Sequence, residues 1–169
     1  FLNACPHLAD RTVVVNGVSK AYAMTGWRIG YLAGPADLVK AMRKVQGQST
    51  SCASSVSQAA AVAALNGPQD CLEGMRVQFK RRYDYIHQAL NDLPGVTCPS
   101  CDGAFYAFPS FQGVIDSRED IRDDTELATW LLETVGVSTV PGSAFGAPGH
   151  LRLSYAASMD YLDDAIKRI

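Results

Sequence analysis

Residues 16–31, NGVSKAYAMTGWRIGY, join two short apolar runs and place a lysine between them. The runs at 12–15 and 28–33 are bounded by turn residues, so we expect two strands, the first of them buried. Lys20 then stands in the loop directly after a buried strand. A lysine held at such a place loses solvation, which lowers its pKa and makes the neutral amine available to attack a carbonyl carbon.

Arg28 follows Lys20 at the start of the second predicted strand. Its planar fork of guanidinium donors suits a dianionic phosphate. Together the two residues predict a lysine nucleophile beside a phosphate anchor. Residue types alone also allow a plainer interpretation, in which both side chains lie on the surface and Arg28 pairs with any nearby carboxylate.

Strands alternate with helices along the rest of the chain, which indicates an α/β fold. Further strands are predicted at 96–98, 104–108, 137–140 and 151–155, with a polar loop at 111–124. Helices are predicted from Pro35 to the polar run 47–51, from about 54 to 65, from 68 to about 93, after a capping box of Asp123 and Glu126, and from near Ser158 to Ile169. The long helix after residue 67 suits a connection between two domains, at 1–67 and 68–169.

The composition is that of an ordinary globular protein, with 47% hydrophobic and 19% charged residues. A net charge of only −2 argues against nucleic acid or an anionic membrane surface as a partner. No apolar run approaches the roughly 20 residues that span a bilayer, and the N-terminus lacks the pattern of a signal peptide, so we expect the cytoplasm. A chain that begins with Phe1 fits a fragment or a processed product.

Five cysteines in a chain of this size are expected to be free thiols. Cys98 and Cys101 have the spacing of a redox motif, but they follow a turn instead of preceding a helix that would lower a thiol pKa. Two further ligands for zinc are lacking near them. The histidines His7, His87 and His150 are isolated, so no metal site is predicted.

Residues 19–31 closely resemble the lysine signature of the class I and II aminotransferases, a family that uses pyridoxal 5'-phosphate. The resemblance implies that Lys20 forms the Schiff base with the cofactor and later moves a proton between the substrate carbon and the cofactor. It also implies that Arg28 binds the cofactor phosphate. Many members carry a serine or threonine three residues before the lysine, whereas Gly17 stands there in this sequence.

The resemblance continues downstream in residues 103–108, 140–146 and 151–155, which look like the strand that opens the small domain and the substrate motif near the C-terminus. Arg152 occupies the position of the arginine that binds the substrate α-carboxylate. A bidentate guanidinium would orient the α-carbon bond that breaks; the plainer alternative is a charge on an edge strand. Residues 48–57 match a stretch near the family's subunit interface, which implies a homodimer.

Only 19 residues precede Lys20, and in the family several active-site groups come long before the lysine. They include the aspartate that partners the pyridine nitrogen, the aromatic residue stacked on the ring and the glycine-rich phosphate loop. We therefore expect the C-terminal part of a fold-type-I enzyme: the end of the large domain followed by the small α/β domain. Such a fragment is expected to be inactive alone.

Residues 23–27, AMTGW, resemble the branch that contains many bacterial aspartate aminotransferases. The expected reaction of the whole enzyme is a ping-pong transfer of the amino group between aspartate and 2-oxoglutarate, with aromatic amino acids or alanine as other substrates to test. Two alternatives stay open. One is a related lyase that resembles aminocyclopropane-carboxylate synthase, and the other is a transcription regulator in which an aminotransferase-like domain follows a DNA-binding domain.

Overall fold

The computed structural model describes all residues from 1 to 169, and the chain divides into two compact units, Phe1–Gly74 and Met75–Ile169. The division falls inside helix α3 (Asp70–Asn91), a few residues after the end of the predicted first domain at residue 67. Both units combine helices with short strands, so the predicted α/β class is confirmed. Every helix is too short or too polar to cross a membrane.

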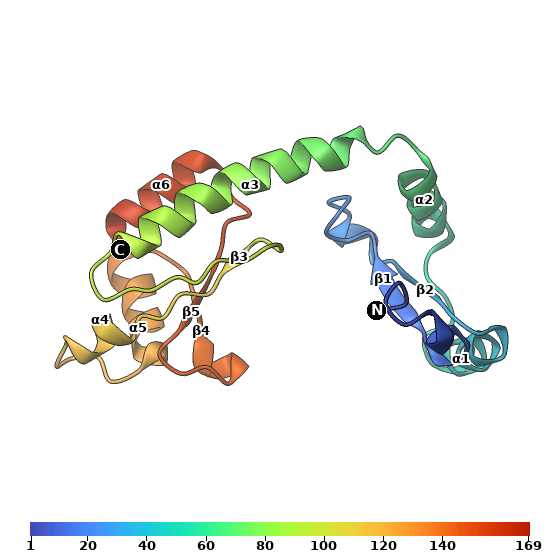
Figure 1. The fold of residues 1–169 in the computed structure, drawn as a ribbon, viewed down its shortest axis with the longest axis horizontal. Helices are drawn as coiled ribbons and strands as arrows, with labels where there is room; N and C mark the ends of the chain where they lie inside the picture. Colours follow the sequence, from blue (N-terminus) through green and yellow to red (C-terminus); the bar gives the residue numbers. More distant parts are fainter. The chain divides into compact units, whose positions relative to one another are not determined.

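The first unit contains a two-stranded antiparallel ribbon of β1 (Val14–Gly17) and β2 (Gly30–Ala33), which lie side by side in Figure 1. The register pairs Val14 with Ala33 and Gly17 with Gly30. A 3-10 helix, η1 (Pro6–Arg11), precedes the ribbon, and a second, η2 (Thr25–Trp27), lies in the loop that joins its strands. The ribbon therefore brings together both ends of the connection at 18–29, which contains Lys20 and is called the lysine loop below.

Two helices follow the ribbon, α1 (Ala36–Ser49) and α2 (Ser55–Asn66), close to the predicted ranges. Pro35 fits the position before α1 because its fixed φ suits a helix start and it has no N–H to leave unpaired. Gly67 and Pro68 end α2 and separate it from α3.

The prediction of a buried strand at 12–15 is wrong in its position and in its burial. The strand begins two residues later, and the side chain of Val15 is 73% exposed. The second strand also starts later, at Gly30, and leaves Arg28 in the loop. A two-stranded ribbon covers neither of its faces, so apolar residues whose sequence pattern predicts burial stay in contact with solvent.

The second unit is built around a three-stranded antiparallel sheet in the order β3-β5-β4. Its strands are β3 (Tyr106–Ala107), β4 (Val140–Pro141) and β5 (Leu151–Ser154). The middle strand, β5, pairs with both neighbours, so Arg152 is not on an edge strand. The strand predicted at 96–98 is wrong, because only Thr97 forms a bridge, with Ser110.

Several helices accompany this sheet in the second unit. Besides α3 they are α4 (Gln112–Asp116), α5 (Asp124–Trp130), the 3-10 helix η4 (Gly142–Phe145) and α6 (Met159–Arg168). A π-helical turn, η3 (Leu131–Val135), continues α5. Figure 1 shows α6 beside the C-terminal half of α3, where the hydroxyl of Tyr85 donates a hydrogen bond to Asp163 at 2.8 Å. The prediction of a continuous loop over 111–124 is wrong, since α4 lies inside it.

The main hydrophobic core belongs entirely to the second unit. It joins Ile86 and Leu90 of α3 to Phe111, Leu151 of β5 and Leu162 of α6. Phe111, Leu90 and Leu151 are fully buried, and burying a side chain of this size contributes about 1.5–3 kcal/mol. This core fixes β5, and with it the backbone of Arg152.

Candidate functional site

Lys20 lies in the turn that follows β1. Val18, two residues before it, is fully buried and anchors the turn, while the backbone N–H of Ala23 donates to the carbonyl of Lys20 at 3.2 Å. The side chain of Lys20 itself is exposed. The predicted loss of solvation is therefore wrong for this chain, because the exposed ribbon offers no apolar wall around the amine.

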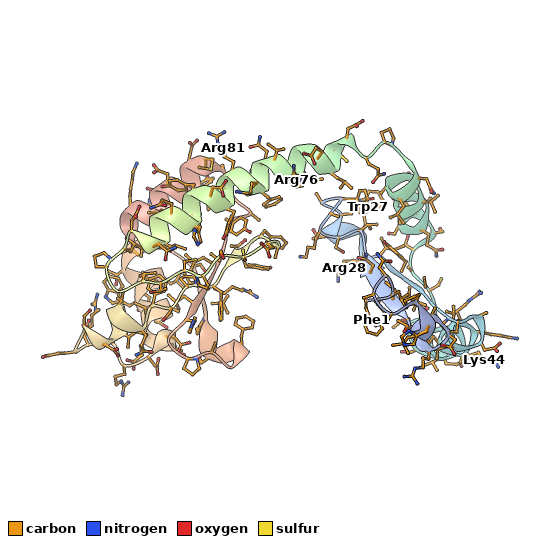
Figure 2. The ribbon with its side chains drawn as sticks, viewed as in Figure 1. Phe1, Trp27, Arg28, Lys44, Arg76 and Arg81 are labelled. Carbon is orange, nitrogen blue, oxygen red and sulfur yellow. The ribbon has the colours of Figure 1, made fainter.

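Arg28 ends the same loop, next to Trp27, as Figure 2 shows. Its backbone is left-handed, with φ 49° and ψ 50°, which costs a residue with a β-carbon about 1–2 kcal/mol. The guanidinium Nη1 donates to the carbonyl of Thr25 at 3.0 Å, and the side chain is exposed. Ala23 of this loop is left-handed as well, with φ 54°. Strained backbone of this kind is concentrated at functional sites.

The lysine loop thus carries one amine and one guanidinium within the first unit. Pyridoxal phosphate presents a carbonyl carbon and a dianionic phosphate, and these two side chains have the chemistry to hold one part each. The residues present therefore fit two parts of the cofactor. Arg152 belongs to the second unit, so the structure brings Lys20 and Arg28 onto one loop and describes Arg152 separately.

Arg152 is half-buried on the middle strand of the second unit's sheet. Its guanidinium carbon lies 4.5 Å from the ring centroid of Tyr106 and 4.8 Å from that of Phe145. No carboxylate of the chain forms an ion pair with it. An arginine whose guanidinium carbon lies over two rings keeps in-plane N–H donors available for an anion.

The loop between β4 and β5 is held in a compact form. The N–H of Gly142 donates to the carbonyl of His150 at 2.7 Å, and a β-carbon on Gly142 would come within 2.3 Å of the carbonyl oxygen of Ala147. Only glycine fits at so close an approach. The motif at 140–146 therefore has a structural reason for its first glycine, and it places Phe145 beside Arg152.

Asp124 anchors this loop from α5. Its side chain is buried, only 2% exposed, and accepts a hydrogen bond from the N–H of Ser143 at 2.7 Å. Burial alone would raise the pKa of this carboxyl, but hydrogen bonds from the backbone and hydroxyl of Ser143 and from the N–H of Gly149 outweigh it and lower the pKa.

The sequence alone did not single out three residues of this region, namely Tyr106 and Phe145, which contact Arg152, and Asp124, which holds the loop of Phe145 through Ser143. Tyr106 and Phe145 lie inside the motifs at 103–108 and 140–146, but the motifs alone assign no role to either ring. Asp124 follows the N-cap residue Asp123, and its burial could not be read from a polar stretch. A carboxylate at the first position of a helix was the available signal.

Cys98 and Cys101 form no disulfide, and Cys98 is buried. Burial, and then the neighbouring Cys101, raise the pKa of the Cys98 thiol. A thiol that stays protonated is a poor nucleophile, so Cys98 fits a structural role. Burial, with Cys101 and Tyr83 beside it, also raises the pKa of Tyr155 to about 12, and the Tyr155 hydroxyl donates to the carbonyl of Ala104 at 3.1 Å.

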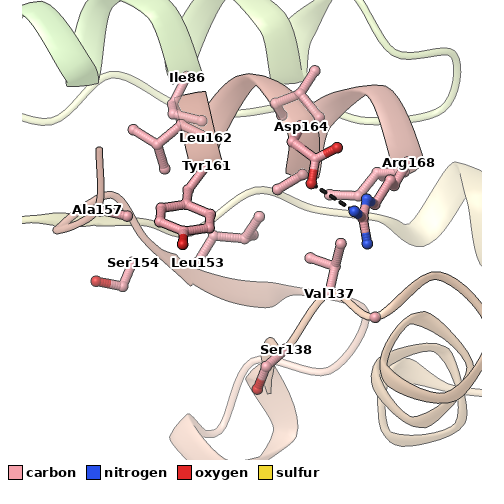
Figure 3. Close-up of a pocket in the computed structure, with 14 residues that line it drawn as sticks. Ile86, Val137, Ser138, Leu153, Ser154, Ala157, Tyr161, Leu162, Asp164 and Arg168 are labelled. Atoms are coloured by element: carbon pink, nitrogen blue, oxygen red, sulfur yellow. Dashed lines mark ion pairs between the residues drawn. The ribbon is translucent and has the colours of Figure 1, made fainter. Parts of the chain in front are cut away.

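A cavity of about 360 Å³ opens in the second unit between α6 and the sheet, as Figure 3 shows. Leu153 of β5, Val137 and Tyr161 of α6 contribute to its lining, and Asp164 pairs with Arg168 at its rim at 2.7 Å. The lining does not include Lys20, Arg28 or Arg152. The sequence therefore assigns no chemistry to the residues that line it.

Comparison with known proteins identifies the family. The family model for aminotransferase class I and II matches residues 1–169. An aspartate/prephenate aminotransferase from Nitrosomonas europaea is 50% identical over 174 residues, 100% of this chain and 44% of the relative. An aspartate aminotransferase from Rhizobium meliloti is 52% identical over 168 residues, 97% of this chain and 41% of the relative.

A solved structure agrees with the sequence matches. The crystal structure of the aspartate aminotransferase from Rhizobium meliloti superposes with a TM-score of 0.90 at 51% identity, over 96% of this chain and 42% of that chain. The chain thus spans well under half the length of the relatives that it matches. Over that span the agreement of sequence and fold leaves one conclusion, which is that the chain belongs to the aminotransferase class I and II family.

Proposed function

We propose that this chain is the C-terminal part of a pyridoxal-phosphate-dependent aminotransferase that transfers an amino group between aspartate and 2-oxoglutarate. The observation that carries the proposal is the lysine loop, in which Lys20 and Arg28 stand on one connection between paired strands. Membership of the family and relatives named aspartate aminotransferases, at about half identity, support it. Residues 1–67 would complete the large domain, and 68–169 would form the linking helix and the small domain.

In this proposal Lys20 would have two tasks. Its amine would hold the cofactor through the carbonyl carbon, and the same amine would act as the base that moves the proton at the substrate α-carbon. Arg28 binds the cofactor phosphate through its guanidinium donors. Pyridoxal phosphate, when bound, supplies the electron sink that allows the bond at the α-carbon to break.

Arg152 would bind the α-carboxylate of the amino acid and of the 2-oxo acid. Both substrates of a transamination carry this group, so one guanidinium serves both halves of the reaction. A bidentate pair fixes the carboxylate in the plane of the guanidinium and thereby orients the α-carbon. The stacked guanidinium of Arg152, which has no carboxylate partner within the chain, supports this role.

A homodimer is part of the same proposal. Residues 48–57 comprise the end of α1, the connection to α2 and the start of α2, and the side chain of Cys52 within them is exposed. Sedimentation of the full-length protein should give twice the mass of one chain. A monomer at concentrations where the enzyme is active would contradict this part of the proposal.

Covalent trapping tests the assignment of Lys20. The full-length protein, loaded with pyridoxal phosphate, is reduced with borohydride and digested, and the modified peptide is located by mass spectrometry. We expect the modification on the peptide that contains Lys20, together with visible absorbance that Lys20→Ala abolishes. Modification of Lys40 or Lys44 instead, or unchanged absorbance in Lys20→Ala, would contradict the assignment.

The name of one relative supports a second acceptor. The protein from Nitrosomonas europaea is named an aspartate/prephenate aminotransferase. Prephenate is also a 2-oxo acid, so its carboxylate could occupy the same guanidinium at Arg152. Measuring kcat/KM with prephenate and with 2-oxoglutarate, each with aspartate as donor, decides which acceptor the full-length protein prefers.

A further inference from the structure

We propose that Tyr106 and Phe145 form an aromatic bracket that sets the plane of the Arg152 guanidinium and so determines how tightly a substrate carboxylate binds. The two rings are positioning residues, since they act through Arg152. The inference rests on the proposed function, in which Arg152 receives that carboxylate. It adds two residues to which the family resemblance assigned no role.

The bracket is defined by the contact of one guanidinium with two rings. The guanidinium carbon of Arg152 is 4.5 Å from the centroid of Tyr106 and 4.8 Å from that of Phe145, both within the range of a cation–π contact. A guanidinium carbon that lies over aromatic rings leaves N–H donors in the plane of the guanidinium for a carboxylate. Because the chain places no carboxylate of its own against Arg152, this edge is available to a ligand.

The sheet fixes the first ring. Tyr106 of β3 pairs with Ser154 of β5, two residues from Arg152, so Tyr106 and Arg152 are diagonal neighbours on one face of the sheet. Phe105 packs against Tyr106 with ring centroids 4.4 Å apart. Tyr106 is therefore held by backbone pairing and by a neighbouring ring before any ligand arrives.

A chain of contacts fixes the second ring, although the side chain of Phe145 is 50% exposed. Phe108 meets Phe145 edge to face at 6.0 Å and 87°, and His150 stacks on Phe108 at 5.3 Å. Asp124 holds the start of the same 3-10 helix through the N–H of Ser143. An exposed ring that is anchored in this way suits a surface that a ligand approaches.

The bracket preorganises the Arg152 side chain for binding a carboxylate. A free arginine side chain must lose rotamer freedom when it binds a carboxylate, and this loss weakens binding. The bracket removes part of that freedom in advance. Loss of one ring should therefore weaken the binding of every ligand that carries the carboxylate by about ten-fold, within the range of a single cation–π contact.

Nuclear magnetic resonance of the 169-residue chain tests the bracket without any catalytic assay. Protons of the Arg152 side chain that lie over two rings should resonate upfield of those of the exposed Arg81. Phe145→Ala should remove a large part of this shift, whereas Tyr161→Ala, which removes an exposed ring elsewhere in the second unit, should leave it in place. An Arg152 spectrum that does not respond to Phe145→Ala would overturn the bracket.

Kinetics of the full-length enzyme test what the bracket does. Tyr106→Ala and Phe145→Ala should each raise KM for amino acid and 2-oxo acid about ten-fold, with kcat little changed, because binding is lost equally in ground state and transition state. Phe145→Tyr, which keeps a ring, should restore most of the affinity. A merely structural role would lower kcat through a smaller active fraction and leave KM unchanged, which would refute the inference.

A double-mutant cycle separates this inference from the proposed function. In the background of Arg152→Ala, the change Phe145→Ala should have no further effect on KM. If Arg152→Ala alone leaves KM unchanged, the proposed role of Arg152 fails, while the spectroscopic test of the bracket still stands. If Arg152→Ala raises KM but neither ring variant does, the bracket is wrong and the proposed function survives.

Discussion

At the scale of single residues, Asp124 should contribute more to the stability of the second unit than its position in a polar stretch of sequence indicates. Its buried carboxylate accepts hydrogen bonds that hold the loop before β5. Removing a buried charged acceptor leaves its donors unsatisfied, so Asp124→Ala should lower the free energy of unfolding by about 3 kcal/mol. Chemical denaturation measures this loss, and Asp102→Ala, an exposed aspartate, is the matched control that should change it little. Equal effects of the two substitutions would contradict the role of Asp124.

The same residue predicts a dependence on pH. The pKa of Asp124 is lowered below its ordinary value of 3.8, so its contribution to stability is complete above that value and is lost as the pH falls through the pKa of the folded protein. The difference in unfolding free energy between the parent chain and Asp124→Ala should therefore be constant near pH 7 and narrow below about pH 4. A difference that stays constant down to pH 2 would contradict the assignment.

The lysine loop shows which properties of single residues can be predicted from the sequence and which cannot. The string around Lys20 and Arg28 was specific enough to give the family, which the comparisons confirm. The exposure of Lys20 agrees with the interpretation drawn from residue types alone, whereas the apolar run before it wrongly favoured a loss of solvation, because burial depends on partners that a local pattern does not describe. Whether Lys20, Arg28 and Arg152 have their proposed roles stays a prediction for the experiments above.

At the scale of elements, the start of α5 was predicted well but not completely. Asp123 is the N-cap, and its side chain accepts from the N–H groups of Thr125 and Glu126 at 2.9 Å each. The other half of the capping box differs, since Glu126 accepts from the N–H of Arg122 instead of that of Asp123. The side-chain pair of Arg122 and Glu126 explains this, because it draws the carboxylate toward the residue before the cap.

Loss of this cap should destabilise the second unit modestly. Asp123→Ala leaves two N–H groups of the first turn without their acceptor, which costs about 1 kcal/mol. Asp123→Asn should keep most of the stability of the parent protein, because an asparagine side chain caps a helix almost as well as an aspartate. Thermal unfolding of both variants checks the prediction. A loss as large as that expected for Asp124→Ala would show that Asp123 does more than cap α5.

Short strands were the least predictable elements. β3 and β4 contain two residues each, although the sequence favoured longer strands at 104–108 and 137–140. The pattern of alternating residues reports extended backbone, but a strand also needs a neighbour at the right register. The helices α1, α2, α3 and α6 were predicted more closely, because their periodicity and end signals are local.

At the scale of the whole molecule, the two units differ in how much core they contain. All members of the main core cluster lie in the second unit, at Ile86 or beyond. The first unit exposes large apolar side chains, including Val15 at 73%, Val45 at 72% and Val56 at 67%. Since burial of apolar surface is the main stabilising term, the second unit should be the more stable of the two.

Hydrogen exchange of the 169-residue chain tests this difference. Amides of β5 and of α3 after Met75 should exchange at least roughly 100-fold more slowly than those of β1 and β2, because local opening of a small core is less costly. Exchange in a denaturant that unfolds the chain provides the control, in which all amides should become fast. Equal protection of the ribbon and of β5 would contradict the assignment of stability to the second unit.

Formation of glutamate tests the central claim most directly. The full-length protein is loaded with pyridoxal phosphate, incubated with aspartate and 2-oxoglutarate, and compared with Lys20→Ala under the same conditions. We predict glutamate and oxaloacetate in equal amounts from the parent protein and a loss of at least a thousand-fold in Lys20→Ala, because the residue that binds the cofactor and moves the proton is gone. Equal rates in the two proteins, or no glutamate from the loaded parent protein, would contradict it.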